Sequence, residues 1–316
     1  MDEWNYDNGL NIPLERSEKA NIAASYIPAR LKNMYNSGID GQVYFCLEDF
    51  HSNKEQVTRN VGAFWFDGKA AQYKGGPKAA YNVFRMLKAL GNDFYAVPAS
   101  AANGCVGMLA GKDGQNIGVM VYNYVNAEAA RDFLSRNVGR LNPAEKKFLV
   151  KIIKSGMYSR IITRQTDVKS LHGAGKKLSN MLSDAAAANE DAEKKKGETQ
   201  AVKISLKNLK GDYKIKKYFI DQSCAKDCDF VPLEEKEASV DNAWEETVEL
   251  PAYSVALFLL EPKPVVVETP PPAAEETAAV PAETPKQPPP PAEKSSEQEK
   301  KIDVPVEKSK DSSVIK

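Results

Sequence analysis

The sequence has little histidine and little cysteine. Its 316 residues include only two histidines, His51 and His172, and four cysteines. A structural zinc site usually takes four cysteine or histidine ligands at short spacing, and only Cys224 and Cys228 lie close together. Catalysis by a serine–histidine or cysteine–histidine pair is also poorly supplied with imidazoles. We therefore expect no metal site.

The sequence also lacks a net charge and a long apolar run. It has 43 basic and 43 acidic residues, so the chain as a whole creates no field that recruits nucleic acid or an anionic membrane. No stretch reaches the roughly 18 apolar residues of a membrane helix. The first residues, MDEWNYDNG, show neither the basic nor the apolar segment of a signal peptide. We expect no nucleic-acid partner and no membrane segment.

The short spacing of Cys224 and Cys228 leaves two states open. A local disulfide across CAKDC and two separate buried thiols are both compatible with this spacing. The sequence alone does not decide between them.

Residues 1–98 alternate between helical and strand patterns. A helix is predicted from Ser17, its cap, to Gly38. The apolar run GQVYFCLEDF then predicts a buried strand. A second helix with an apolar face is predicted between Pro77 and Gly91. Strands and helices in this order are typical of a parallel sheet or a β/α barrel.

After Pro98 the pattern changes to antiparallel strands. CVGMLAGKDGQNIGVMVYNYV predicts two strands around an Asp-Gly turn, which favours type I′. AVKISLKNLKGDYKIKKYFID predicts a second hairpin around Gly211, and WEETVELPAYSVALFLLEP supplies one or two closing strands. About six antiparallel strands, in residues 99–126 and 198–261, indicate a small β-sandwich.

Two further segments interrupt and follow this predicted sandwich. Residues 127–197, rich in alanine, lysine and glutamate, predict a helical insertion. The insertion is either a surface excursion or an arm that binds a protein partner. Residues 262–316 hold twelve of the 19 prolines and no aromatic residue, a composition typical of a disordered linker or tail.

The segment DEWN contains the leading candidate for chemistry. Carboxylates act as acid, base and nucleophile in glycoside hydrolysis, and an indole face packs against a sugar ring. Glu3 beside Trp4 and Asn5 therefore fits a sugar-binding site, although spacing alone favours an exposed glutamate at a frayed terminus.

DEWN resembles the nucleophile motif at the end of the seventh strand in retaining glycoside hydrolases with a (β/α)8 barrel. YFCLED resembles the eighth strand of the β-xylosidase/α-L-iduronidase family, with Tyr44 and Asp49 matching. GGPKAAYNVFRMLKALG is similar to that family's last barrel helix, and the later strands are similar to its closing sandwich. The resemblance covers residues 1–126 and 200–261.

The resemblance implies the last two β/α units of a barrel, followed by a sandwich, in a retaining hydrolase that needs no cofactor. It makes Glu3 the nucleophile. The substrate-binding residues that we expect are Trp4, Asn5, Tyr44, Phe45, Asp49 and Trp65. Phe45 stands where the family has a sugar-stacking tryptophan, so stacking is reduced or the ligand differs.

The family's acid/base glutamate lies on the fourth strand, far upstream of the nucleophile, and retention needs both carboxyl groups about 5 Å apart. Two β/α units cannot close a barrel. We therefore interpret the chain as the C-terminal portion of a longer glycosidase, inactive alone, with a carbohydrate substrate and the missing barrel half as its partner. Its compartment is unknown, and an extracellular or surface location is then favoured. The alternative is a non-catalytic β-sandwich module for adhesion or assembly.

Overall fold

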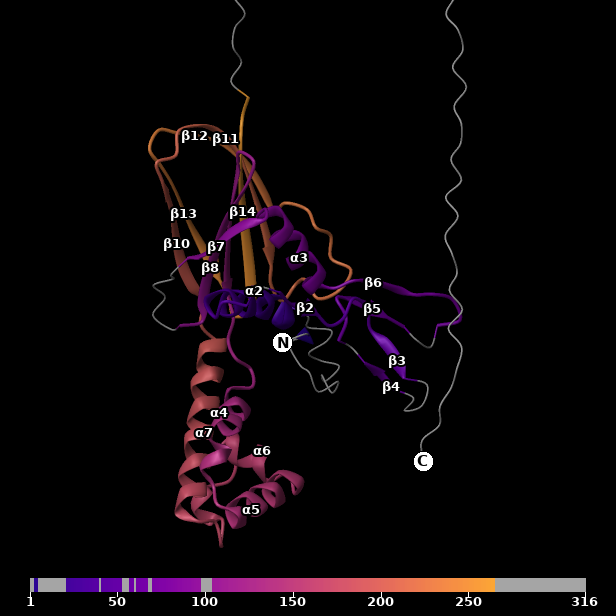
Figure 1. The fold of residues 1–316 in the computed structure, drawn as a ribbon, viewed down its shortest axis with the longest axis vertical. Coiled ribbons are helices and arrows are strands. Elements are labelled where there is room, and N and C mark those ends of the chain that lie inside the picture. Colours follow the sequence, from indigo (N-terminus) through magenta and orange to yellow (C-terminus); the bar gives the residue numbers. More distant parts are fainter. Residues whose placement is uncertain are drawn as a thin grey trace, which may run out of the picture. The chain divides into compact units, whose positions relative to one another are not determined.

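The computed structural model describes residues 3–4, 21–39, 41–52, 57–59, 61–67, 70–97 and 104–264. These residues form helices and mainly antiparallel sheets (Figure 1). Within them, no helix is both long and apolar enough to span a membrane. The predicted disordered tail lies outside the described residues from residue 265 onward.

The first elements form a parallel strand–helix–strand unit. Strand β1 (Glu3–Trp4) pairs in parallel with β2 (Val43–Tyr44), and helix α2 (Asn21–Asn36) lies between them in the sequence. Parallel neighbours need such a crossover connection, because a tight turn joins only antiparallel strands. The strand–helix–strand order is therefore confirmed for these elements. The buried strand predicted over GQVYFCLEDF is wrong, because β2 has only two residues and Val43 is 60% exposed.

Two short hairpins and a helix follow β2. The hairpins are β3 (Phe50–Ser52) with β4 (Val57–Arg59), and β5 (Phe64–Phe66) with β6 (Gly75–Pro77). Helix α3 (Ala79–Ala89) then begins directly after Pro77 and Lys78 and ends before Gly91, whose φ of 84° suits glycine. The predicted second helix is confirmed.

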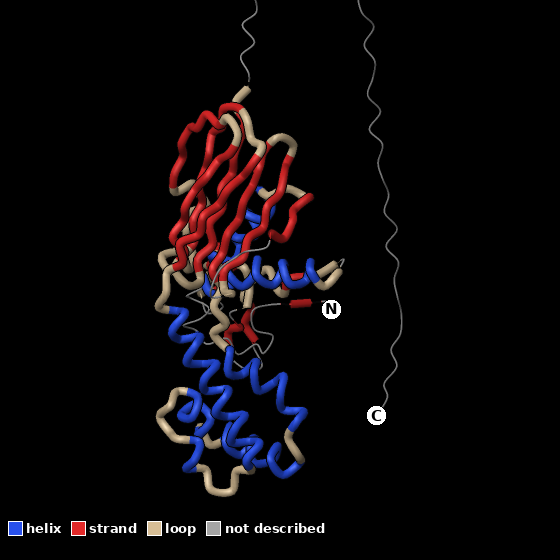
Figure 2. The backbone as a smooth tube through the Cα atoms, turned by 90° about the vertical axis from the view of Figure 1, so that its left-hand side faces the viewer, coloured by secondary structure: helices blue, strands red, loops and turns tan. Residues whose placement is uncertain are grey.

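The remaining antiparallel strands make a six-stranded and a two-stranded sheet, and the tube view shows these strands gathered in one part of the molecule (Figure 2). The six-stranded sheet has the order β12-β11-β14-β9-β8-β7. Its strands are β7 (Asp93–Val97), β8 (Val106–Asp113), β9 (Asn116–Asn123), β11 (Gly211–Ile220), β12 (Glu234–Val240) and β14 (Ser254–Pro262). The two-stranded sheet pairs β10 (Gln200–Lys207) with β13 (Ala243–Leu250). Because β7 pairs with β8, the large sheet reaches back across the boundary predicted at residue 98.

The large sheet is covered on both faces. On one face, Ile27 of α2 and Met86 of α3 share a buried cluster with Leu109, Met120 and Leu257. The opposite face packs against the small sheet in a second cluster, in which the rings of Trp244 and Phe258 lie 5.6 Å apart. Strand β14 is buried along most of its length, as expected for a strand between two layers.

Two turn predictions need correction. Strands β10 and β11 do not form the predicted hairpin, since β10 pairs with β13 whereas β11 pairs with β12 and β14. Strands β8 and β9 do form a hairpin, but only Gly114 of its two loop residues has a positive φ, 61°. A positive φ at the first loop position alone fits type II′, whereas type I′ requires it at both.

Four helices lie between β9 and β10 in the sequence: α4 (Ala129–Asn137), α5 (Pro143–Lys154), α6 (Met157–Ile162) and α7 (Lys176–Lys196), with short 3-10 turns η1 (Val138–Arg140) and η2 (Val168–Ser170). They bury a core of their own, which includes Leu149, Ile161 and Leu182. Asn142 caps α5 reciprocally with Glu145, and Pro143 occupies the first turn as predicted.

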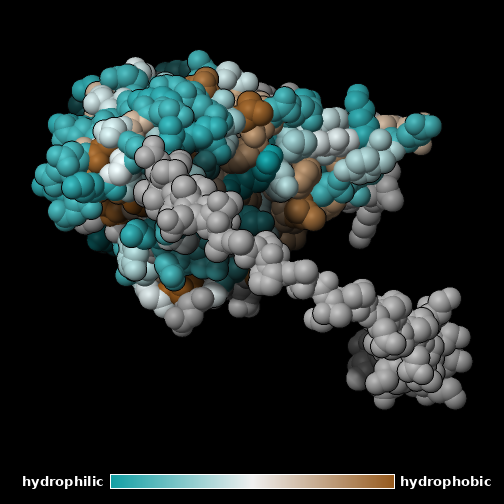
Figure 3. Space-filling model, turned by 90° about the horizontal axis from the view of Figure 1, so that it is seen from above, coloured by the Kyte–Doolittle hydropathy of each residue, from teal (hydrophilic) through white to brown (hydrophobic). Residues whose placement is uncertain are grey.

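The surface carries few large apolar areas on the face drawn in Figure 3, which is mainly hydrophilic. Exposed large apolar side chains elsewhere include Tyr35, Tyr95, Val231 and Leu233. Scattered apolar side chains of this kind are normal for a globular surface.

Candidate functional site

Backbone pairing brings the two predicted site segments together. Glu3 lies opposite Val43 and Trp4 opposite Tyr44, and the Phe45 N–H donates to the Trp4 carbonyl at 2.9 Å. Both parallel strands run toward the same edge. Glu3 and Trp4 are therefore neighbours of the segment that begins at Tyr44, whereas Asp2 and Asn5 lie outside the described residues.

Trp4 is a core residue of this edge. Its side chain is only 7% exposed, and its ring centroid lies 5.1 Å from that of Tyr44 and 6.1 Å from that of Tyr26. The Tyr44 ring in turn packs against that of Phe84 in α3, with ring centroids 4.9 Å apart. This aromatic packing favours a structural role for Trp4 over the predicted sugar contact.

Tyr44 has a hydroxyl that stays protonated. Burial raises the pKa of Tyr44 above its ordinary value, and the charges of Cys46 and Asp49 raise it further. The hydroxyl is therefore a neutral group at the pH of most enzymes, able to donate a hydrogen bond but not to act as a phenolate.

Asp49 forms a buried ion pair. Its Oδ1 accepts from Lys78 Nζ at 2.6 Å and from the Gly62 N–H at 2.8 Å, and the side chains of Asp49 and Lys78 are 2% and 5% exposed. Burial raises the pKa of Asp49, which Lys78 partly offsets, and burial lowers the pKa of Lys78. The pair joins the segment after β2 to the start of α3.

This pairing changes the expectation for Asp49. A carboxylate that is bonded to a buried ammonium and a backbone N–H has no open face for a sugar, so its position favours a structural role over the predicted substrate contact. Gly62 permits the approach, because a Cβ there would lie 2.2 Å from the Glu48 carbonyl carbon. The sequence pattern assigned Lys78 no role beyond its place at the start of the predicted second helix.

Phe45 and Trp65 remain partly exposed. Phe45 contacts Phe50, with ring centroids 6.4 Å apart. The Trp65 indole N–H donates to Asp227 Oδ1 at 2.7 Å, and Lys226 Nζ lies 5.0 Å from its ring centroid. Trp65 is thus held by residues far away in the sequence, neither of which the sequence pattern had singled out.

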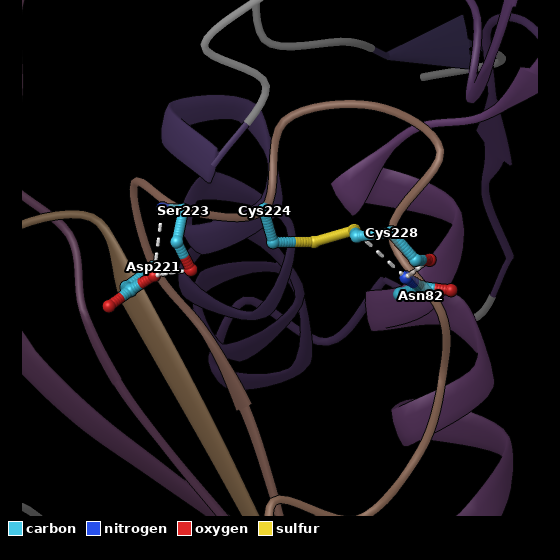
Figure 4. The surroundings of a disulfide bond; sticks show 5 residues. All are labelled: Asn82, Asp221, Ser223, Cys224 and Cys228. Atoms are coloured by element: carbon cyan, nitrogen blue, oxygen red, sulfur yellow. Dashed lines mark hydrogen bonds between the residues drawn. A yellow bond between two sulfur atoms is a disulfide. The ribbon is translucent and has the colours of Figure 1, made fainter.

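Those residues belong to a loop closed by a disulfide between Cys224 and Cys228, which settles the open question about this pair (Figure 4). The Ala225 carbonyl accepts from the Ala79 N–H at 3.0 Å. The Asp227 N–H donates to the Pro77 carbonyl at 2.7 Å, and Asn82 Nδ2 donates to the Cys228 carbonyl at 2.9 Å. We call residues 224–228 the clasp loop, since it holds the β6–α3 junction.

Asp227 and Gly76 fit each other closely within this arrangement. Asp227 has a φ of 58°, which is uncommon for a residue other than glycine. A Cβ on Gly76 would lie 2.0 Å from Asp227 Oδ1 and 2.9 Å from Trp65 Nε1. A glycine is therefore required at position 76 for the Asp227–Trp65 hydrogen bond to form.

An aromatic–carboxylate pair joins the β5–β6 hairpin to the segment after β2. The Tyr73 hydroxyl donates to Glu48, and the rings of Tyr73 and Phe66 stack with centroids 5.7 Å apart. Tyr73 is 69% exposed. Aromatic rings beside a carboxylate suit sugar recognition, because rings cover apolar sugar faces and carboxylates accept from hydroxyls.

Two other features bear on ligand binding. A pocket of about 310 Å³ lies beside the clasp loop and is lined by residues that include Met86, Tyr218 and Phe230, but by none of the predicted site residues. Across the described ranges, no group of three or more histidine, cysteine, aspartate or glutamate side chains is arranged to hold a metal ion.

No protein-family model and no curated protein matches the sequence. Among solved structures, the chain is similar to the GH39 enzyme from Xanthomonas axonopodis pv. citri, with 14% identity and a TM-score of 0.45 over 83% of this chain and 44% of that one. It is also similar to a glucosidase from Croceicoccus marinus, with 14% identity and a TM-score of 0.49 over 84% of this chain and 46% of that one. A third similar structure is a monomeric beta-xylosidase from Caulobacter crescentus CB15, with 14% identity and a TM-score of 0.42 over 83% of this chain and 45% of that one. The chain spans less than half the length of these structures.

Proposed function

We propose that this chain forms the C-terminal part of a retaining glycoside hydrolase, with Glu3 as the nucleophile. The parallel pairing of β1 with β2 supports the proposal most directly. Active-site residues of β/α barrels lie at the carboxyl ends of the strands. Since β1 and β2 are parallel neighbours, Glu3 and Tyr44 occupy the same end of adjacent strands.

The proposed substrate is a glycoside of plant or cell-wall material. Partly exposed rings are available near the strand ends at Phe45 and Trp65, and Tyr73 lies beside Glu48. The second carboxyl group that retention requires is not supplied by Asp49, which is paired with Lys78. We therefore assign the acid/base to the remaining barrel strands, on the same longer chain or on a separate one.

A mechanism-based fluoro-sugar tests the nucleophile. In the full reading frame that supplies the remaining strands, the trapped glycosyl group should appear on Glu3 in peptide mass spectrometry, and Glu3→Gln should abolish the labelling. The 316-residue chain alone should not turn over aryl glycosides of xylose, arabinose or uronic acids. A label on Glu48 or Asp49, or turnover by the isolated chain that depends on Glu3, would contradict the assignment.

A second candidate function is a non-catalytic sandwich module. The burial of Trp4 and the pairing of Asp49 with Lys78 favour it, because both residues then serve packing and not catalysis. The same labelling experiment distinguishes the two candidates, since a module without catalysis takes up no fluoro-sugar in the full reading frame.

A further inference from the structure

The zero net charge of the chain conceals a strongly basic helical segment. Between residues 131 and 177 the sequence has twelve lysine and arginine residues and only three acidic residues. All twelve basic residues are exposed. The segment covers α4, α5, α6 and η2 and the beginning of α7. A local excess of this size creates a positive field that the whole-chain balance does not reveal.

The three acidic side chains in this segment are engaged with neighbouring groups. Glu145 is buried in the capping box of α5. Asp167 accepts from the Lys169 N–H at 2.9 Å, and Asp132 accepts from Asn126 Nδ2 at 2.8 Å. These carboxylates stabilise local structure and do not neutralise the lysines of α5.

Helix α5 concentrates this charge on its outer face. Glu145, Leu149 and Ile152 are buried on the inner side. The exposed residues of the helix that share one side, at 100° per residue, are Lys146, Lys147, Val150, Lys151, Ile153 and Lys154. Among the described residues, none of these four lysines forms an ion pair.

Two aliphatic side chains lie among the lysines. Val150 and Ile153 are each 50% exposed. The phosphate backbone of nucleic acid has no apolar surface against which these two side chains could be buried. This face of α5 also presents no aromatic ring for stacking on bases or sugars. An anionic bilayer offers both partners, since lipid headgroups attract lysines and the acyl boundary accepts aliphatic groups.

We propose that the outer face of α5 binds the surface of an anionic lipid bilayer. The four lysines contact the headgroups, and Val150 and Ile153 insert at the headgroup–acyl boundary. Lysine suits this contact because its long stem lies along apolar surface while its ammonium stays in water. The contact is peripheral and is independent of the glycosidase proposal.

Vesicle co-sedimentation of the full 316-residue chain tests this surface. The chain should bind vesicles of equal parts phosphatidylcholine and phosphatidylglycerol, should not bind phosphatidylcholine alone, and should dissociate as salt is added. The triple variant Lys147→Gln/Lys151→Gln/Lys154→Gln should weaken binding by about fivefold per lysine, or about a hundredfold in total.

Matched controls use other exposed residues of the same types. Lys203, Lys207 and Lys210 are exposed lysines outside the helical segment, and their triple change to glutamine should leave binding within about threefold. Val150→Ser/Ile153→Ser should weaken binding, whereas Val231→Ser/Leu233→Ser should not, although the latter pair is 64% and 67% exposed.

Several results would overturn the proposal. They are equal binding to neutral and anionic vesicles, equal losses in the two lysine variants, and unchanged binding by Val150→Ser/Ile153→Ser. Binding of duplex DNA without vesicle binding, lost in the α5 lysine variant, would assign the surface to nucleic acid instead.

Discussion

At the scale of single residues, the Asp49–Lys78 pair is the buried ionic contact of the candidate site. Taking either charge out of water costs free energy, and the attraction between the two charges, with the Gly62 N–H, offsets that cost only while both are present. Each partner's pKa moves in the direction that opposes its charged form. The buried charge of each residue is therefore tolerated only while the other charge is present.

Single substitutions in this pair should lower the free energy of unfolding by about 3–5 kcal/mol, because each leaves an uncompensated buried charge. The double variant Asp49→Asn/Lys78→Met should lose much less than the sum of the two single losses. Denaturant unfolding of the four proteins measures the coupling. Additive losses would mean that the two side chains do not interact in solution.

The pH dependence of the two single variants should have opposite signs. In Lys78→Met the folded-state pKa of Asp49 rises further above 3.8, so the loss of stability is largest at neutral pH and shrinks as the pH falls. In Asp49→Asn the folded-state pKa of Lys78 falls further below 10.5, so the loss shrinks as the pH rises. A loss that is independent of pH in both variants would contradict the buried-charge explanation.

At the scale of elements, the clasp loop connects segments that are far apart in the sequence. It leaves β11, makes backbone hydrogen bonds to Pro77 and Ala79, and positions Asp227 against Trp65. Its disulfide closes a five-residue loop, for which chain entropy gives about 2 kcal/mol. The clasp loop therefore has two effects: it stabilises the β6–α3 junction, and it orients Trp65.

Removing the disulfide should affect both properties. Cys224→Ser/Cys228→Ser should lower the free energy of unfolding by about 2 kcal/mol and shift the tryptophan emission to the red, because Trp65 loses a fixed neighbour. Trp4 and Trp244 are buried elsewhere, so Trp65→Phe should remove that shift. Wild-type protein treated with dithiothreitol should match the double serine variant, and unchanged emission in both would mean that the loop holds its shape without the bond.

Local elements could be predicted from the sequence, but their partners could not. The β8–β9 hairpin is set by alternating apolar residues and a glycine turn, all of which lie within one segment. The run from β10 to β11 carries a similar signal, yet burial against β13 and β14 decides its pairing. The sequence pattern did not predict strand β12, because its sequence, EEKEASV, is mostly charged and contributes few residues to the core.

At the scale of the whole chain, the same limitation applies to the candidate site. The resemblance implied the proximity of DEWN to YFCLED, because it places them at the ends of neighbouring barrel strands, and β1 pairs in parallel with β2. The Asp227–Trp65 hydrogen bond joins residues 162 positions apart, and no periodicity in the sequence encodes such a contact. Charge segregation in residues 131–177 was in the sequence, but the balanced total concealed it.

Three of the four buried clusters in the described residues should determine how that part of the chain responds to mutation; the fourth is a small one of Val125, Ala192 and Tyr253. One joins α2 and α3 to β8, β9 and β14, and a second joins β14 to β10 and β13. The third belongs to α4–α7. Elements that share a cluster should lose protection together, since a cavity in the cluster weakens all of its walls.

Hydrogen exchange measured by mass spectrometry should follow this division. Met86→Ala in α3 should cost about 2–5 kcal/mol and increase exchange in α2, β9 and β14, although these strands lie outside the α/β region of the sequence. Leu182→Ala in α7 is the matched change in the helical cluster and should increase exchange in α4 and α6 while β9 and β14 keep their protection. If Met86→Ala left β9 and β14 protected, α2 and α3 would not share a cooperative core with the sheet and would unfold as a separate unit.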